Sequence, residues 1–361
     1  MLRVKLAISA AVVFIAVAQS SMAAPKVVLV TGGADGGDGT TAVRTKLDSP
    51  FGVDFDRAGN LYLVELTGQR VRRIDKAGLL STIAGDGTKG SAGEGGPAAA
   101  AQFNGMHALA IGPNNTLYIA DTWNNCVRAI DLDNGLIRRI AGTGEKGYSG
   151  DGGPATAARF GGIYCASLDP AGDALYLADL DNRRIRRVDL GTGIVSTVAG
   201  NGARGVPEEG APAVESPLVD PRAVAVDKEG NVYVLERSGH ALRVVDPAGK
   251  IRTLIGTGKA GASDGGGDAR KATLNGPKHL CIDHDGNVII ADTENHLIQK
   301  YFPRERKIVR IVGSGRKGSR GIGGPPLEVE LNQPHGVYLY RDGTLYISDS
   351  SNHRVLKVVN E

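Results

Sequence analysis

Side chains that could bind a ligand recur at a nearly constant spacing along this chain of 361 residues. They lie 56 to 58 residues apart, and each comes directly after a position, often proline, at which a strand is expected to begin. The set consists of Phe51, His107, Tyr164, Arg222, Lys278 and His335. His279 lies one residue further on. Imidazole, phenol, guanidinium and ammonium groups suit a concave site, where a few fixed polar groups orient a ligand. The spacing predicts that these residues meet at one place, near the mouth of a central channel.

The chemistry open to this set has a plain and a sharper interpretation. His107 and His335 are most simply hydrogen-bonding side chains that line a channel. Tyr164 and Arg222 could bind an anionic group or orient a carbonyl, because a guanidinium forms strong charge-assisted hydrogen bonds. The alternative for both is a rim position that faces water.

A repeat of about 57 residues must position this set. The segment Asn60-Leu61-Tyr62-Leu63-Val64-Glu65 recurs in five further copies, with these equivalent positions: Tyr62, Tyr118, Tyr176, Tyr233, Ile289 and Tyr346. Each unit carries four short strand signals, and turns such as Asp283-His284-Asp285-Gly286-Asn287 supply the positive φ that a tight hairpin needs. Four antiparallel strands in each of six units are typical of an all-β, six-bladed β-propeller.

The two ends of the repeat region predict how the ring closes. The last unit lacks a fourth strand, and Lys26–Thr31 matches the fourth-strand pattern. Pairing this N-terminal strand (residues 26–31) with the last blade would remove both exposed edges. We therefore expect a propeller over residues 24–361, with repeats at 50–103, 106–160, 163–220, 221–275, 277–332, and 334–359 plus 26–48.

An acidic residue ends the second strand of every unit: Glu65, Asp121, Asp179, Glu236, Asp292 and Asp349. A carboxylate that repeats with the architecture is expected to cap a turn or to pair with arginine rather than to catalyse a reaction. Arginine runs lie on the third and fourth strands, interleaved with aspartates: Arg72-Arg73, Arg138-Arg139, Arg183-Arg184 and Arg186-Arg187. We expect these runs to form a solvated outer edge rather than a nucleic-acid surface.

Composition and charge exclude several classes of protein. The 52 glycines are about twice the usual ~7% share, and they gather in turns and in long connections between the units.

The first 23 residues, with Arg3, Lys5 and an apolar run over Leu6–Ala18, are typical of a secretory signal peptide. Without Arg3 and Lys5, 40 basic side chains face 39 acidic ones, a balance unsuited to neutralising phosphates. The three cysteines have no C-x-x-C spacing and are expected to be small buried thiols: Cys126, Cys165 and Cys281.

These repeats resemble the NHL-repeat family over essentially all of the chain after residue 23. The triplet that names the family occurs as Asn295-His296-Leu297, with variants at Asn352-His353-Arg354 and Asn182-Arg183-Arg184. Units one and four depart from the pattern, because Glu65 and Glu236 replace Asp and no Asn precedes their third strand. The glycine-rich connection at 142–155 is similar to that of bacterial secreted NHL proteins and of the teneurin propeller. The resemblance implies a six-bladed propeller and fixes no activity.

One NHL-like enzyme, peptidyl-hydroxyglycine α-amidating lyase, carries zinc-binding histidines in Pro-His motifs at this kind of position. Carried over residue by residue, His335 matches well and His107 less well. His279 misses by one residue, which on a strand would point its imidazole to the opposite face. The lyase resemblance thus implies a zinc site for which His107 and His335 are weak candidates, and Asp-Gly-rich connections such as residues 35–39 leave calcium open as the divalent metal. The gluconolactonase-like hydrolases are a further alternative, reached through architecture alone.

Taken together, these patterns predict an exported binding module, periplasmic or secreted, that holds a protein, peptide or glycan ligand at one face or at the channel mouth. The alternative is a metal-dependent lyase or hydrolase with its site at the same mouth. The candidate ligand-binding residues are His107, Tyr164, Arg222, Lys278, His279 and His335. We expect a monomer with no assigned cofactor, no nucleic-acid partner and no membrane association after signal cleavage.

Overall fold

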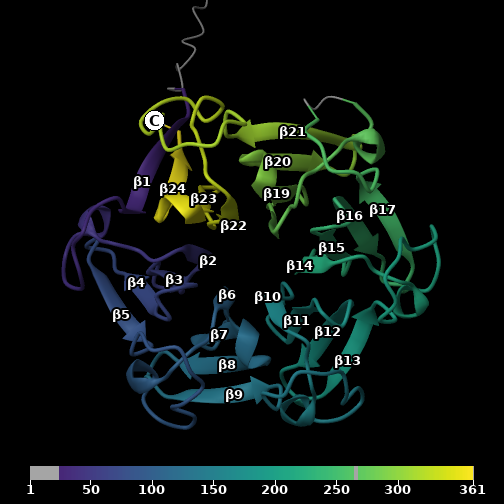
Figure 1. The fold of residues 1–361 in the computed structure, drawn as a ribbon, viewed down its shortest axis with the longest axis horizontal. Helices are drawn as coiled ribbons and strands as arrows, with labels where there is room; N and C mark the ends of the chain where they lie inside the picture. The colour runs from purple at the N-terminus through teal and green to yellow at the C-terminus, as the bar shows by residue number, and fades with distance from the viewer. Residues whose placement is uncertain (1–23, 264–266, 361) are drawn as a thin grey trace, which may run out of the picture.

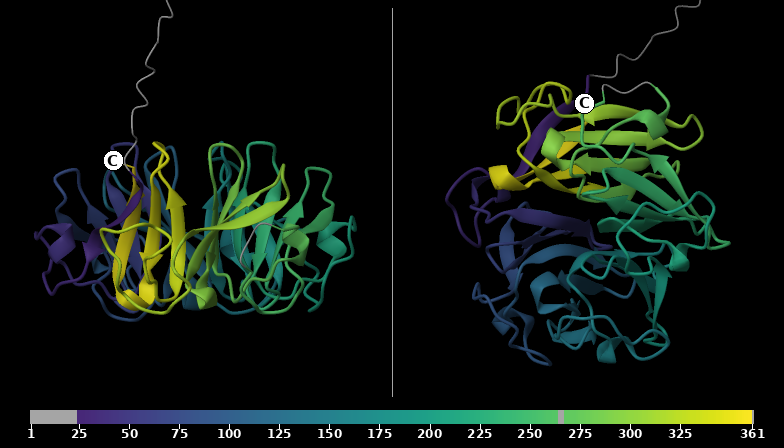
Figure 2. Two further views of the ribbon diagram at one scale, coloured as in Figure 1. Left: turned by 90° about the horizontal axis from the view of Figure 1, so that it is seen from above. Right: turned by 45° about the vertical axis from the view of Figure 1, so that its right-hand side comes forward.

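Six antiparallel sheets of four strands form blades around a central channel (Figure 1). The computed structural model describes residues 24–263 and 267–360, so the predicted signal peptide lies outside the described residues. Seen from the side, the ring is a disc through whose thickness the strands run (Figure 2). The predicted all-β, six-bladed propeller is therefore confirmed.

Each blade is a meander in which the first strand faces the channel and the fourth lies at the outside. Blades 1 to 3 consist of β2 (Pro50–Phe55), β3 (Leu61–Glu65), β4 (Val71–Ile74) and β5 (Leu80–Ala84); β6 (Met106–Ile111), β7 (Thr116–Asp121), β8 (Cys126–Asp131) and β9 (Ile137–Ala141); β10 (Ile163–Leu168), β11 (Ala174–Asp179), β12 (Arg184–Asp189) and β13 (Val195–Ala199). Blades 4 to 6 consist of β14 (Pro221–Val226), β15 (Val232–Glu236), β16 (Ala241–Val245) and β17 (Ile251–Ile255); β18 (His279–Ile282), β19 (Val288–Asp292), β20 (Leu297–Phe302) and β21 (Lys307–Val312); β22 (Pro334–Leu339), β23 (Leu345–Asp349), β24 (Arg354–Val359) and β1 (Lys26–Gly32). Single-turn 3-10 helices occupy the loops: η1 (Ala42–Arg44), η2 (Ala98–Ala100), η3 (Thr122–Asn124), η4 (Ala155–Ala157), η5 (Ala213–Glu215), η6 (Ala269–Lys271), η7 (Thr293–Asn295) and η8 (Ser350–Asn352). Within the described residues, no helix is long and apolar enough to cross a membrane.

The N-terminal strand closes the ring as predicted. β1 pairs antiparallel with β24, from Lys26 opposite Val359 to Gly32 opposite Arg354, and so extends one residue beyond the predicted segment. The sheet order β1-β24-β23-β22 makes β1 the fourth strand of blade 6. The first and last parts of the chain are thereby held in one sheet.

The long glycine-rich connections lie along the outer edge of the blade that follows them. Gly95 N donates to Ile137 O at 2.9 Å, and Gly152 N donates to Val195 O at 2.8 Å. In blade 6 the same bond runs from Gly323 N to Val27 O at 2.7 Å, which again places β1 as a fourth strand. Each connection thus covers strand-edge groups that would otherwise be open to another chain.

The acidic residue at the end of each second strand is buried and anchors the loop that precedes a first strand. Oδ1 of Asp349 accepts a hydrogen bond from Asn332 N at 2.7 Å. Asn352, of the NHL-like triplet, donates to Oδ2 of Asp349 and to Gly318 O, both at 2.7 Å. Equivalent bonds to the loop backbone occur in the other five blades. The predicted turn-capping role of these carboxylates is confirmed.

The expectation of a solvated outer edge is wrong for part of the arginine runs. Arg72 and Arg186 are 7% and 0% exposed, and Arg186 forms ion pairs with Asp179 at 3.5 Å and Asp151 at 2.7 Å. Neighbouring side chains on a strand point to opposite faces, so only Arg187 of that pair reaches the partly exposed face. In two of the four runs, one arginine, Arg72 or Arg186, is therefore an internal partner of the repeated carboxylate, Glu65 or Asp179.

Apolar side chains of adjacent blades pack against each other and form the core. One cluster joins Tyr118 of blade 2 to Phe160, Leu175 and Leu177 of blade 3. All three cysteines are free thiols; Cys126 and Cys165 are buried and Cys281 is half-buried, in keeping with the prediction.

Candidate functional site

The predicted site residues lie where the first strands begin, around the centre of the ring (Figure 1). The pairing of first and second strands shifts register at this position, so Tyr164 falls between the pairs Ile163–Asp179 and Cys165–Ala178. The same shift brackets His107, Arg222 and His335. Such β-bulges bend a strand and redirect a side chain, and they occur often beside functional sites.

Four of the predicted residues form one contacting layer with Phe51 at the channel mouth. The ring centroid of Phe51 lies 5.0 Å from that of His107 and 4.3 Å from that of His335. His107 contacts Tyr164 at 4.6 Å, and the Arg222 guanidinium carbon lies 4.7 Å from the centroid of Tyr164. This layer, called the mouth layer below, runs through blades 6, 1, 2, 3 and 4.

Lys278, in blade 5, is the sixth residue of the mouth layer. Its Nζ forms an ion pair with Oε1 of Glu294 at 2.8 Å, and Oε2 of Glu294 accepts a hydrogen bond from Gln333 Nε2 at 2.9 Å. Gln333 lies two residues before His335. Each blade therefore contributes one residue to the mouth layer.

His279 does not share this layer. Its Nδ1 accepts a hydrogen bond from Val337 N, in the next blade, at 3.4 Å. It also lines a chamber of about 330 Å³ along the first strands, together with Asp54, Ser167, Cys281 and Tyr338.

The histidines of the NHL-like triplets hold the backbone that presents the mouth layer. Nδ1 of His296 accepts from Gln333 N at 3.1 Å, and Nδ1 of His353 accepts from Ser49 N at 3.1 Å. His240 makes the same bond to Gly276 N, although its unit lacks the triplet Asn. Each bond crosses from one blade to the next and ends two residues before a residue of the mouth layer. The triplet thus links a blade to the mouth-layer residue of its neighbour.

Burial and neighbouring cations keep the histidines neutral at neutral pH. Desolvation lowers the pKa of His107 and His335 well below the ordinary value, and the charges of Arg222 and Lys278 lower it further. The pKa of His279 falls to about 4 for the same two reasons, desolvation and Arg222. The positive charge at the mouth therefore belongs to Arg222 and Lys278.

The histidine pair does not fit the metal site that the lyase resemblance implied. Nδ1 of His107 lies 2.8 Å from Gly105 O, and Nδ1 of His335 lies 2.7 Å from Gln333 O. The phenyl ring of Phe51 contacts both imidazoles. No group of three His, Cys, Asp or Glu side chains in the described part of the chain is placed to hold a metal ion. The mouth layer therefore lacks the ligand set that zinc requires.

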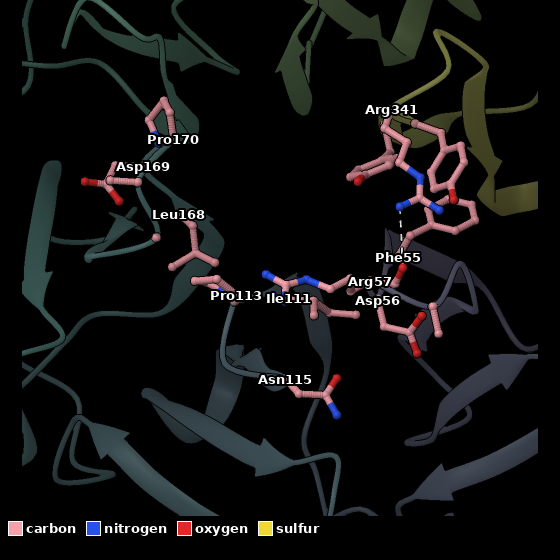
Figure 3. A pocket seen from close by; sticks show the side chains of 16 residues that line it. Phe55, Asp56, Arg57, Ile111, Pro113, Asn115, Leu168, Asp169, Pro170 and Arg341 are labelled. Carbon is pink, nitrogen blue, oxygen red and sulfur yellow. Dashed lines mark hydrogen bonds between the residues drawn. The ribbon is translucent and has the colours of Figure 1, made fainter.

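Two features escaped the sequence prediction. Trp123, in η3, is 46% exposed and its ring lies 5.6 Å from that of His107. At the other end of the first strands, a cavity of about 750 Å³ is lined by Phe55, Arg57, Tyr338, Tyr340 and Arg341 among others (Figure 3). The column of turn residues could have indicated it, because it breaks the repeat symmetry as the mouth residues do: Arg57, Pro113, Pro170, Lys228, His284 and Arg341.

Models of two repeat families match this chain. The teneurin NHL domain matches residues 162–264, and the NHL repeat matches residues 274–301 and 331–358. The chain belongs to the NHL-repeat β-propeller family. The second NHL match includes His353 and the first includes His296, the two triplet histidines that hold the mouth backbone.

Curated relatives share this propeller within longer proteins. The NHL-repeat chain is 26% identical over 264 residues to protein SUPPRESSOR OF QUENCHING 1 of Arabidopsis thaliana, covering 70% of this chain and 24% of that protein. It is 29% identical over 309 residues to human NHL repeat-containing protein 2, covering 77% and 42%. The chain thus spans less than half the length of these relatives. An auxiliary nutrient binding protein of Bacteroides thetaiotaomicron shares the fold, with a TM-score of 0.69 and 16% identity over 93% of this chain and 76% of that one.

Proposed function

We propose that this NHL-repeat propeller is an exported binding module that takes its ligand at the mouth layer. Convergence is the observation that carries the proposal: six residues of five types, one from each blade, lie together where the first strands begin. A position that serves only the architecture keeps its residue type from blade to blade, as the buried carboxylates do. The mouth position does not, which is expected where a site is built on a symmetric scaffold.

Further support comes from the surroundings of the mouth layer. The layer combines aromatic surface with cationic groups, the mixture by which sites orient partly apolar ligands. The similarity in fold to a nutrient binding protein agrees with a binding role. Export follows from the signal-like sequence of residues 1–23, and we propose a periplasmic or secreted monomer.

Trp123 provides an internal reporter for this proposal. It is the one tryptophan of the chain and lies against His107. Its indole is partly exposed at the mouth, so a ligand on the layer would change its fluorescence.

The test is a ligand screen by Trp123 fluorescence and thermal shift, using sugars, sugar acids, amino acids and short peptides. Each ligand found is titrated against His335→Ala and against His284→Ala, since His284 is an exposed residue of the blade 5 hairpin at the opposite end of the first strands. The proposal expects binding to be lost in His335→Ala and kept in His284→Ala. Binding that survives His335→Ala and Lys278→Ala but is lost in Arg341→Ala would place the site in the opposite cavity and overturn the proposal.

A further inference from the structure

Arg222 is a buried cation whose hydrogen-bonding capacity is largely unused. Its side chain belongs to the mouth layer and the residue is 3% exposed. Nη1 donates to Tyr164 O at 3.0 Å, and this is its one hydrogen bond to the described residues. Nε is buried and has no partner among those residues. A buried guanidinium normally has a carboxylate partner, because desolvating an unpaired charge is costly.

The carboxylates around the mouth are already engaged by other groups. Glu294 uses one oxygen for Lys278 and the other for Gln333. Asp220 is paired with Arg237, whose Nε lies 2.9 Å from Oδ2, and it also accepts from Ser238. The described residues show no ion pair between Arg222 and either carboxylate.

Two other neighbours do not neutralise Arg222 either. The face of Tyr164 offers a cation–π contact at 4.7 Å, which attracts the guanidinium but carries no charge. Burial raises the pKa of Cys165, so its thiol stays neutral and donates weakly to Val224 O. Counting Lys278 with Glu294 and Arg237 with Asp220, one positive charge remains without a partner at the mouth.

We propose that Arg222 binds the carboxylate of a small monocarboxylate ligand, an inference that rests on the proposed binding function. A planar guanidinium with a free Nε and Nη2 matches the two oxygens of a carboxylate in a bidentate pair. The single uncompensated charge favours a monoanion over a phosphate dianion. The partly exposed ring of Tyr164 offers a flat surface for the body of such a ligand.

Size also favours a small molecule over a chain. The mouth layer is closely packed, and the chamber along the first strands beyond it has about 330 Å³. Val224, which lines this chamber, lies two residues after Arg222 on β14. A ligand held by Arg222 could extend past Val224 only into this volume, which is near the lower end of the range for ligand pockets and suits a small carboxylate.

The first experiment uses stability without ligand. In a carboxylate-free buffer, Arg222→Gln should melt at the same or a higher temperature than the wild type, because it removes an unpaired buried charge and retains a donor for Tyr164 O. Arg237→Gln should melt lower, because it leaves the carboxylate of Asp220 unpaired. If Arg222→Gln melts lower by as much as Arg237→Gln, Arg222 has a partner within the protein and the inference is wrong.

The second experiment uses matched probes at constant ionic strength, read by Trp123 fluorescence. Sodium benzoate and sodium glucuronate are compared with benzamide and glucose, and a peptide with a free C-terminus with its C-terminal amide. We expect an acid to bind and its neutral partner to bind at least about tenfold more weakly, as loss of a charged hydrogen bond implies. Arg222→Gln should abolish the difference, Arg222→Lys should reduce it, and the surface variant Arg252→Gln should keep it.

The outcomes separate the two proposals. Neutral probes could bind as tightly as acids, with an affinity that falls in His335→Ala. This result would support the proposed binding function but contradict the role of Arg222. Acid binding that is unchanged in Arg222→Gln overturns it as well. Binding of the peptide acid alone contradicts the small-molecule assignment. If every probe binds His335→Ala and Arg222→Gln as tightly as it binds the wild type, the ligand does not bind at the mouth layer and the proposed site is wrong.

Discussion

At the scale of single residues, His279 shows how burial controls charge in this channel. Its imidazole is a hydrogen-bond acceptor for the next blade, and desolvation together with Arg222 lowers its pKa to about 4. In the unfolded chain the same group titrates near 6.5. As the pH falls below about 7, His279 takes up a proton in the unfolded state, whereas in the native state it stays neutral until about pH 4. The contribution of His279 to the free energy of unfolding therefore falls as the pH falls.

We therefore predict that His279→Asn reduces the acid sensitivity of the fold. An Asn oxygen can accept from Val337 N but does not titrate. Between pH 7.5 and pH 5 the variant should lose about 2 kcal/mol less unfolding free energy than the wild type. Denaturant unfolding at both pH values measures this, with the exposed His284→Asn as control. An equal loss in wild type and His279→Asn would contradict the pKa assignment.

A second residue-scale prediction concerns metal. Because Phe51 contacts both His107 and His335 and the described residues place no third ligand beside them, chelation should leave the melting temperature unchanged. Elemental analysis should show no stoichiometric zinc or calcium that depends on His335. Stoichiometric zinc in the wild type that is lost in His335→Ala would revive the lyase-like alternative.

At the scale of elements, the repeated carboxylate and its arginine hold each blade to the loop that presents the mouth layer. Asp179 anchors Gly161, three residues before Tyr164, and Arg186 connects Asp179 to Asp151 in the preceding connection. The loop, the second strand and the third strand are thus tied at one buried point. This buried point therefore fixes the position of the loop that leads into Tyr164 at the mouth.

We predict that Arg186→Met costs about 3–5 kcal/mol of unfolding free energy, because it leaves a buried carboxylate unpaired. Arg187→Met, one residue away on the partly exposed face, should cost less than about 1 kcal/mol. Chemical denaturation of the two variants provides the comparison. Equal effects would show that the two arginines are equivalent, as the solvated-edge interpretation of the run implied.

The contrast between Arg186 and Arg187 shows which features of the structure could be predicted from the sequence. The 57-residue period predicts the blades and the repeated carboxylates, because both recur with the architecture. Alternation along the strand also separates Arg186 from Arg187, a distinction that the solvated-edge interpretation of the whole run overlooks. The bulges at Tyr164 and Arg222 leave no signature in residue type, so the close packing of the mouth layer could not be predicted. The roles of His240, His296 and His353 depend on contacts between blades and needed the structure.

At the scale of the whole molecule, closure by β1 makes the ring a single unit. Six of the seven residues of β1 pair with the last strand of the chain, and the final glycine-rich connection covers its outer edge. A closed ring exposes few strand edges and keeps the six mouth residues at fixed distances.

We predict that deletion of Lys26–Thr31 causes aggregation or a large fall in melting temperature, because β24 loses its partner and exposes an edge. Deletion of the exposed Ala24 and Pro25 alone should have little effect. Size-exclusion chromatography and thermal melts test both. A deletion variant that melts like the wild type would contradict the closure of the ring by β1.

The mouth layer connects these scales, since a repeated framework presents six residues of five types at one end of the channel. The most direct measurement is a crystal structure of the protein with the carboxylate that changes Trp123 fluorescence most. We predict that the ligand lies on the mouth layer with its carboxylate in hydrogen-bond contact with Arg222. A ligand located instead between Arg57 and Arg341, in the cavity at the opposite end of the channel, would contradict it.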